Sequence, residues 1–176
     1  MKIKYLAITL VLFVVSCKEQ EARRPITASK TQTLASTAEQ LKKINNIEEA
    51  KVQNYIERDS LSEYKATANG FWYCYLNKND ETQVKPKEGD EVEILLEIFD
   101  LNNQIIYSKE ALGIRNYKVD KEDFIPAIQQ GIKMMKTGET IKFVIPSYHA
   151  YGIVGDGNKI GVNQSIVSIV TLINIK

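Results

Sequence analysis

The stretch VIPSYHAYGIVGDG, residues 144–157, places two tyrosines and the only histidine of the chain between a β-like run and a glycine-rich loop. No helical pattern follows the glycines, as a phosphate-binding loop would require, so we interpret residues 152–164 as a flap. His149 has neither metal-ligand partners at a suitable spacing nor a nucleophile paired with it. We therefore predict no metal and no cofactor. Tyr151 is the other candidate in this stretch, and the role it would have is implied by the resemblance described below.

Strands are predicted on both sides of this stretch. The run TIKFVIP (140–146) leads into it, and SIVSIVTLINIK (165–176) follows the flap. In EVEILLEIF (91–99) apolar residues alternate with polar ones, which is the period of a half-buried strand. The Asn-rich residues 101–104 predict a chain reversal into IIYS (105–108) as an antiparallel neighbour.

One helix is predicted between these strands. Pro126 lies near its first turn, Gly138 closes it, and Lys133 and Lys136 stand near its end, where the helix dipole favours cations. Its apolar stripe consists of Phe124, Ile125, Ile128, Ile132 and Met135. A short helix against a twisted antiparallel sheet is an α+β arrangement, and the groove between them is the natural ligand site.

The first residues, MKIKYLAITLVLFVVSC, predict a signal peptide over residues 1–16. Their end, Val14-Val15-Ser16-Cys17, resembles a bacterial lipobox, so we expect Cys17 to carry lipid and to anchor the chain to a membrane of the cell envelope, on its periplasmic or surface side. The alternative is an ordinary secretory signal with an incidental cysteine. The remaining Cys74 predicts a small buried apolar residue and leaves no intrachain disulfide in the mature form.

Two segments separate this signal from the domain predicted over residues 69–176. Residues 17–38 are polar and lack apolar periodicity, which predicts a flexible tether. Residues 39–68 predict an amphipathic helix whose stripe positions are Leu41, Ile44, Ile47 or Glu48, Val52, Tyr55 and Ile56. This helix packs on the domain, on a second copy of the chain, or on a membrane or partner protein.

Four short motifs then follow one another in a specific order. They are Gly89-Asp90-x-Val92, Phe124-Ile125-Pro126, Gly131 with Met135 and Gly138, and Pro146-x-x-x-Ala150-Tyr151-Gly152. From about residue 70 to the end, this order resembles the FKBP-type peptidyl-prolyl cis-trans isomerases. With the lipobox, tether and helix in front, the chain looks most like the gliding-motility-associated isomerase lipoproteins of that family.

The resemblance implies an FKBP-like twisted antiparallel sheet wrapped on one short helix, and it implies roles for single residues. Tyr151 would donate its hydroxyl, and Ile125 its backbone N–H, to substrate carbonyls. Tyr107 stands where the family has an aspartate and completes the catalytic set. The implied substrate-binding set is Leu96, Ile106, Tyr117, Phe124, Ile128, Ile160 and Ser168.

The chain also departs from the family pattern. The pair Ile106-Tyr107 stands for a Phe-Asp pair, and Leu96, Ile128 and Ser168 each replace an aromatic residue. The cavity stays apolar but loses ring surface, so we expect an isomerase of modest turnover. Without the aspartate, a Tyr107 that pointed outward would leave Tyr151 unsupported, whereas Tyr117 is expected to restore part of the wall.

Rotation about an X-Pro bond needs no metal or reactive nucleophile, because a dry pocket can favour the twisted amide over the planar one. We expect an isomerase that acts on proline-containing polypeptides and assists the folding of envelope or exported proteins, with a link to gliding motility implied by the resemblance. The alternatives are a noncatalytic chaperone or binding module, and a structural lipoprotein of a motility or secretion apparatus that pairs through the N-terminal helix. The formal net charge of +1 argues against nucleic acid as a partner.

Overall fold

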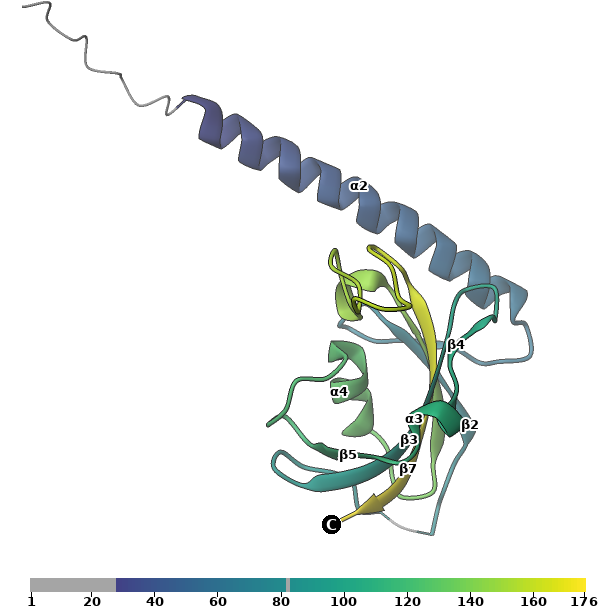
Figure 1. Ribbon diagram of the computed structural model, residues 1–176. Coiled ribbons are helices and arrows are strands. Elements are labelled where there is room, and N and C mark those ends of the chain that lie inside the picture. Colours follow the sequence, from purple (N-terminus) through teal and green to yellow (C-terminus); the bar gives the residue numbers. More distant parts are fainter. Residues whose placement is uncertain (1–27, 82) are drawn as a thin grey trace, which may run out of the picture. The chain divides into compact units, whose positions relative to one another are not determined.

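The computed structural model describes residues 28–81 and 83–176 of the chain (Figure 1). The predicted signal peptide, the predicted lipidation site Cys17 and the tether up to residue 27 lie outside these residues. The chain divides into two units between Thr37 and Ala38, and the fold described below is that of the second unit, Ala38–Lys176. Within the described residues, no helix is long and apolar enough to cross a membrane.

A single antiparallel sheet forms the body of this unit. Its strands run in the order β1-β2-β6-β7-β3-β4, and β5 pairs with the same strand β3 as β4 does. The strands are β1 (Lys65–Ala66), β2 (Trp72–Asn77), β3 (Glu91–Phe99), β4 (Ile105–Tyr107), β5 (Arg115–Lys118), β6 (Thr140–Ile145) and β7 (Ile166–Ile175). The helices are α2 (Ala28–Arg58), α3 (Lys109–Leu112), α4 (Pro126–Ile132) and the 3-10 turn η1 (Ser147–His149). The predicted α+β arrangement is confirmed.

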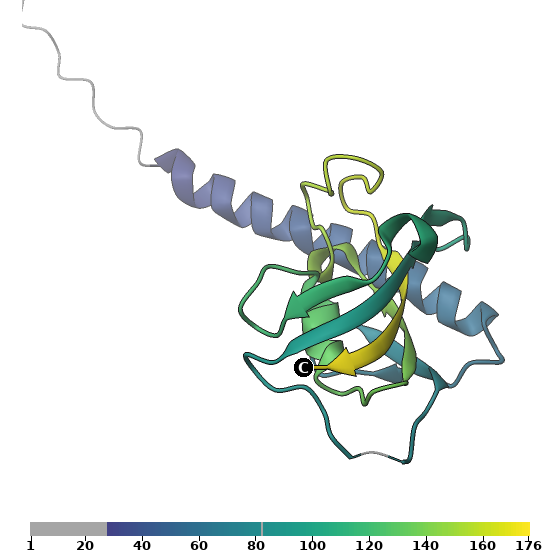
Figure 2. The ribbon, with the colours of Figure 1, turned by 60° about the horizontal axis from the view of Figure 1, so that its bottom comes forward.

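The main core lies between α4 and the sheet, whose strands curve around this helix (Figures 1 and 2). The alternation predicted for residues 91–99 is correct, since the apolar side chains that alternate with the glutamates are all buried: Val92, Ile94, Leu96 and Ile98. Ile128 and Ile132 of α4 are fully buried against them. Gly131 lets α4 approach the sheet closely, because a Cβ at this position would overlap the Phe143 ring.

The helix α4 is shorter than the sequence predicts. It begins at Pro126 as expected but ends at Ile132, well before Gly138. Beyond it, the N–H groups of Met134 and Met135 bond to carbonyls three residues back, which tightens the chain into turns. Lys133 forms an ion pair with Asp120 of a loop, so this lysine does not mark the end of the helix as predicted.

The second half of α2 covers the other face of the sheet. Val52 and Tyr55 of α2 pack on Val144 of β6 and Val167 of β7, whose neighbours in sequence point to the main core. An ion pair strengthens this contact: Lys142 Nζ lies 2.6 Å from the Asp59 carboxylate and 5.5 Å from the centre of the Tyr55 ring. The sequence analysis left three partners open for this helix, and the structure shows it packed on the domain of its own chain.

The bounds of α2 differ from the predicted helix over residues 39–68. The helix begins at Ala28, within the segment predicted as a flexible tether, and ends at Arg58. Just beyond its end, the Asp59 carboxylate accepts hydrogen bonds from the hydroxyls of Ser62 and Tyr64, in the segment that leads to β1. Leu41 and Ile47, nearer the start, remain 42% and 57% exposed.

Candidate functional site

A hollow of about 500 Å³ opens between the start of α4, the inner face of β3 and the flap. It is lined by Leu96, Ile98, Tyr107, Leu112, Arg115, Asp123, Phe124, Ile125, Ala150, Tyr151 and Asp156. Strand alternation turns Leu96 and Ile98 toward it, and Pro126 at the first turn of α4 fixes Phe124 and Ile125 at its edge. The walls are therefore largely aliphatic and aromatic, and the charged groups are Arg115 at the start of β5 and Asp123 and Asp156 in loops.

Among the donors on the residues that line this hollow, those of the two residues predicted to bind substrate carbonyls are not engaged by the protein. Within the described residues, neither the Tyr151 hydroxyl nor the Ile125 backbone N–H has an acceptor. Burial, helped by the negative charge of Asp156, raises the pKa of Tyr151 above its usual 10.0, so the hydroxyl stays a neutral donor at physiological pH. An apolar pocket with two free donors is suited to a ligand that carries carbonyl groups.

Asp156 supplies a carboxylate that the sequence analysis did not find. It sits in the flap between two glycines and accepts hydrogen bonds from the Tyr107 hydroxyl and from the backbone N–H groups of Asn158 and Ile160. Burial alone would raise the pKa of Asp156, but the bonds from Tyr107 and the two N–H groups outweigh it and lower the pKa below 3.8. Asp156 therefore remains charged. Tyr107 does not point outward but lines the hollow.

The flap is fastened to β4 through the same contact. The Asn158 amide donates to the Tyr107 hydroxyl at 3.1 Å, and Lys159 Nζ donates to the Ile106 carbonyl at 3.3 Å. The Lys159 ammonium also lies 5.1 Å from the centre of the Tyr107 ring. The missing aspartate on β4 is thus matched by an aspartate on the facing flap, and the pattern Gly-Asp-Gly is the signal that could have found it.

The structure brings five of the predicted site residues together at the hollow: Leu96, Tyr107, Phe124, Ile125 and Tyr151. The other five lie outside its lining: Ile106, Tyr117, Ile128, Ile160 and Ser168. Ile128 and Ser168, which were predicted to bind the substrate, are fully buried in the sheet–helix core and do not line the hollow. Ile160 is 2% exposed and packs into the main core, so it does not line the hollow.

Tyr117 does not line the hollow but supports Phe124, which does. Its ring stacks on Phe124 with 5.0 Å between centres, and its hydroxyl accepts a hydrogen bond from the Asp120 N–H. The Arg115 guanidinium lies 5.7 Å from the centre of the same Phe124 ring, and Arg115 itself lines the hollow. Phe124 therefore contacts both an aromatic ring and a cation, which fixes the wall of the hollow.

His149 does not line the hollow. It ends η1, where its ring packs against Tyr148 with 4.8 Å between centres. Burial lowers the pKa of His149 below 6.5, against the opposing effect of a hydrogen bond with the backbone of Asn69. In the described part of the chain, no cluster of three or more histidine, cysteine or acidic side chains is able to hold a metal ion.

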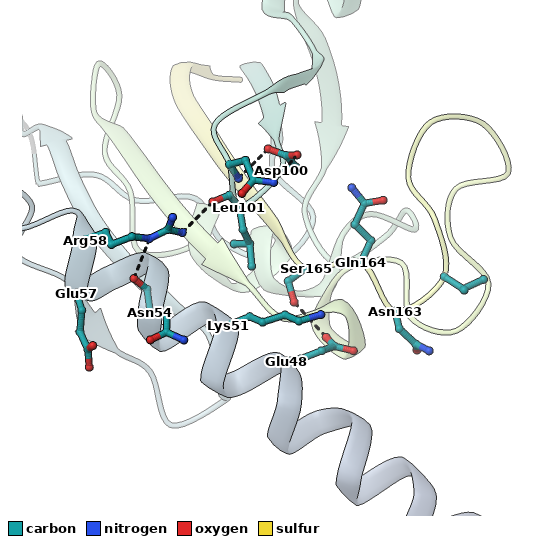
Figure 3. A pocket seen from close by; sticks show the side chains of 12 residues that line it. Glu48, Lys51, Asn54, Glu57, Arg58, Asp100, Leu101, Asn163, Gln164 and Ser165 are labelled. Carbon is teal, nitrogen blue, oxygen red and sulfur yellow. Dashed lines mark hydrogen bonds between the residues drawn. The ribbon is translucent and has the colours of Figure 1, made fainter.

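A larger hollow of about 960 Å³ lies between α2 and two loops of the domain (Figure 3). Its lining is mostly polar and charged and includes Lys51, Arg58, Asp100 and Gln164. It lacks the apolar walls of the smaller hollow, where the residues implied by the family resemblance gather. We therefore place the candidate active site in the smaller hollow.

The sequence model of the FKBP-type peptidyl-prolyl cis-trans isomerases matches residues 82–173, more than half of the chain. The chain belongs to this family. No curated protein matches it.

Among solved structures, the chain is similar to FkpA from Escherichia coli, at 24% identity and a TM-score of 0.63 over 100% of this chain and 82% of that one. It is similar also to a peptidyl-prolyl cis-trans isomerase from Pseudomonas syringae, at 22% identity and a TM-score of 0.62 over 77% of this chain and 95% of that one. The three FKBP domains of wheat FKBP73 match with 22% identity and a TM-score of 0.56, over 65% of this chain and 49% of that one. These likenesses show a shared fold.

Proposed function

We propose that the smaller hollow catalyses cis-trans isomerisation of X-Pro bonds in polypeptides. The observation that carries this proposal is an apolar pocket with two unengaged donors, the Tyr151 hydroxyl and the Ile125 N–H. The twisted amide carries less charge on its oxygen than the planar amide, so a water-poor pocket favours it. A thousandfold acceleration requires only about 4 kcal/mol, which desolvation and one or two hydrogen bonds can supply.

In this mechanism the proline ring lies against the aliphatic and aromatic walls formed by Leu96, Ile98 and Phe124. Tyr151 donates to one substrate carbonyl, and the Ile125 N–H donates to a neighbouring carbonyl that orients the peptide. The role of Tyr107 is to donate its hydroxyl to Asp156, and this bond keeps the flap at the mouth of the pocket. Every step is a matter of binding, orientation and exclusion of water.

Isomerase activity is tested by exchange NMR on a short X-Pro peptide with an equimolar amount of the full chain. The protein should accelerate exchange between the cis and trans signals. The variant Tyr148→Phe serves as a control, because the Tyr148 hydroxyl bonds to Glu49 outside the pocket and its loss should leave the rate unchanged. An exchange rate equal to that of the peptide alone would contradict the proposal.

We further propose that the clients are envelope or exported proteins and that lipid on Cys17 holds the enzyme at the membrane. The supports are the lipobox that ends at Cys17 and the resemblance to gliding-motility-associated isomerase lipoproteins. The variant Cys17→Ala should move the protein from the membrane to the soluble fraction and abolish its labelling by a radioactive fatty acid. A protein that stays in the membrane without label would contradict the lipid anchor. Impaired gliding of a strain lacking the gene, restored by the wild-type gene, would support the motility role.

A binding function without catalysis is the second candidate. It is favoured by two apolar flap residues beside the site, Ile153 and Val154, which are 66% and 78% exposed. Under this hypothesis the double variant Ile153→Ser, Val154→Ser should lose the suppression of aggregation of a proline-free client, and Tyr151→Phe should retain it. The enzyme hypothesis predicts that Tyr151→Phe lowers peptide isomerisation.

A contact role for α2 is the third candidate, whether with a second copy or with motility or secretion components. The exposed Leu41 and Ile47 of α2 favour it. The double variant Leu41→Ser, Ile47→Ser should then abolish self-association or complex formation and leave isomerase activity intact. Sedimentation of the full chain and this variant distinguishes the outcomes.

A further inference from the structure

Glu48 of α2 is a buried carboxylate that the mechanism above does not use. It is 3% exposed and accepts three hydrogen bonds. The Ser147 backbone N–H and hydroxyl each donate at 2.7 Å, and the Ser165 hydroxyl donates at 3.1 Å. Figure 3 shows Glu48 projecting from α2 toward Ser165, with this bond drawn.

The two serines mark the ends of the connection between β6 and β7. Ser147 begins η1 just after β6, and Ser165 directly precedes β7. Everything in between, including Tyr151 and Asp156, belongs to this one connection. A single carboxylate therefore ties together the two ends of the segment that carries the Tyr151 hydroxyl and the Asp156 carboxylate.

Ser147 passes this constraint on to Tyr151. The Ser147 carbonyl accepts the N–H groups of Ala150 and Gly152, each at 2.8 Å, so Tyr151 lies between two residues bonded to Ser147. The Tyr151 carbonyl in turn accepts the Gly155 N–H at 3.2 Å, at the start of the loop that holds Asp156. A shift of Ser147 must therefore move the Tyr151 backbone.

Anchoring α2 to the sheet does not require Glu48. The apolar contacts of Val52 and Tyr55 and the ion pair of Asp59 with Lys142 already hold the helix there. A buried carboxylate is costly to desolvate and is retained only where its hydrogen bonds are satisfied, and such bonds are directional where apolar packing is not. The three bonds of Glu48 thus specify the geometry of the connection more than the attachment of the helix.

We propose that Glu48 is a positioning residue of the active site, which sets the Tyr151 backbone through Ser147 and holds the base of the flap through Ser165. This inference rests on the proposed isomerase function of the smaller hollow. It gives α2, which lies outside the residues matched by the family, a role in positioning the active site. Glu48 itself does not touch the substrate.

The test compares the full chain with Glu48→Gln and with Glu49→Gln. The first substitution keeps the size of the side chain but removes its charge, so that none of the hydrogen bonds with the serines is charge-assisted any longer, whereas Glu49 is exposed and bonds the Tyr148 hydroxyl. We expect Glu48→Gln to lower kcat by about tenfold, as for the loss of one hydrogen bond to a charged group, with KM changed by less than about twofold because the apolar walls stay in place. Glu49→Gln should match the wild type.

Hydrogen exchange gives a readout that is independent of activity. In Glu48→Gln the amides of Ala150 and Gly152 should exchange about tenfold faster, while those of β3 keep their rates. The inference would be overturned if the amides of Ala150 and Gly152 exchanged at the same rate in Glu48→Gln and in the wild type. It would also be overturned if the amides of β3 exchanged faster to the same extent. If the wild-type chain itself is inactive, the proposed function fails, but the exchange data still decide whether Glu48 positions this segment.

Ser165→Ala covers the case in which Glu48→Gln does not fold. It removes one of the three bonds and leaves the carboxylate paired with Ser147. We expect kcat to fall by roughly threefold, the lower range for loss of one hydrogen bond, with KM kept. An unchanged kcat together with unchanged exchange at Ala150 and Gly152 would contradict the proposed role.

Discussion

Replacement of Tyr151 by phenylalanine isolates the contribution of its hydroxyl to isomerisation. The ring and its contacts with the core remain, and the hydroxyl makes no hydrogen bond within the described residues, so folding stability should hardly change. In the bound transition state the variant loses one neutral hydrogen bond, which contributes about 0.5–1.5 kcal/mol. This corresponds to roughly a twofold to twelvefold fall in kcat/KM.

The variant should therefore slow catalysis without abolishing it, because the greater part of the barrier reduction comes from the apolar walls. Exchange NMR on an X-Pro peptide gives the rate, and urea denaturation of the same samples gives the free energy of unfolding. Phe124→Ala offers the opposite comparison, since it keeps the hydroxyl and removes a wall. If Tyr151→Phe retained the full rate at unchanged stability, the hydroxyl would have no part in the reaction and the assigned role would be refuted.

Three further predictions concern stability and pH. Asp59→Asn leaves the Lys142 ammonium without its carboxylate and should cost about 1–3 kcal/mol in urea denaturation, so an unchanged midpoint would contradict the ion pair. Gly131→Ala should destabilise the protein by about 1–3 kcal/mol, because the added methyl group overlaps the Phe143 ring. This cost outweighs the better helix propensity of alanine. A raised melting temperature would show instead that the ring can move. The folded-state pKa of Asp156 lies below 3.8, so the stabilisation of the flap by this carboxylate should be complete above pH 3.8. It should be lost as the pH falls through the lowered pKa. NMR shifts of the flap residues that already change near pH 6 would refute this.

The strands and the apolar half of the site were predictable because they depend on local patterns. The alternation in residues 91–99 fixed which side chains of β3 face the core, and Pro126 fixed the start of α4 next to Phe124. The end of α4 was not predictable in this way. The chain beyond Ile132 is tightened by bonds at Met134 and Met135, and the lysines that suggested a longer helix are held by loop residues.

Contacts between distant segments account for the rest. Asp156 and Tyr107 are 49 residues apart in sequence, and only the fold shows that the flap supplies a carboxylate to β4. Family position placed Ile128 and Ser168 at the pocket, but smaller side chains at these positions are enclosed by the core instead of reaching the surface of the hollow. Glu48 shares one position of the predicted apolar stripe with Ile47, but only the fold shows that its partners are Ser147 and Ser165, which lie 99 and 117 residues further along the chain.

The packing of α2 on the outer face of the sheet limits where such a protein can be divided by proteolysis or by gene fusion. A cut near residue 60 would uncover Val144 and Val167, which are 0% and 1% exposed, and would separate the Lys142 ammonium from the Tyr55 ring. A fragment without α2 would expose an aliphatic, aggregation-prone surface on the outer face of the sheet. Recombination that transplants the isomerase into another polypeptide therefore has to carry the preceding helix with it.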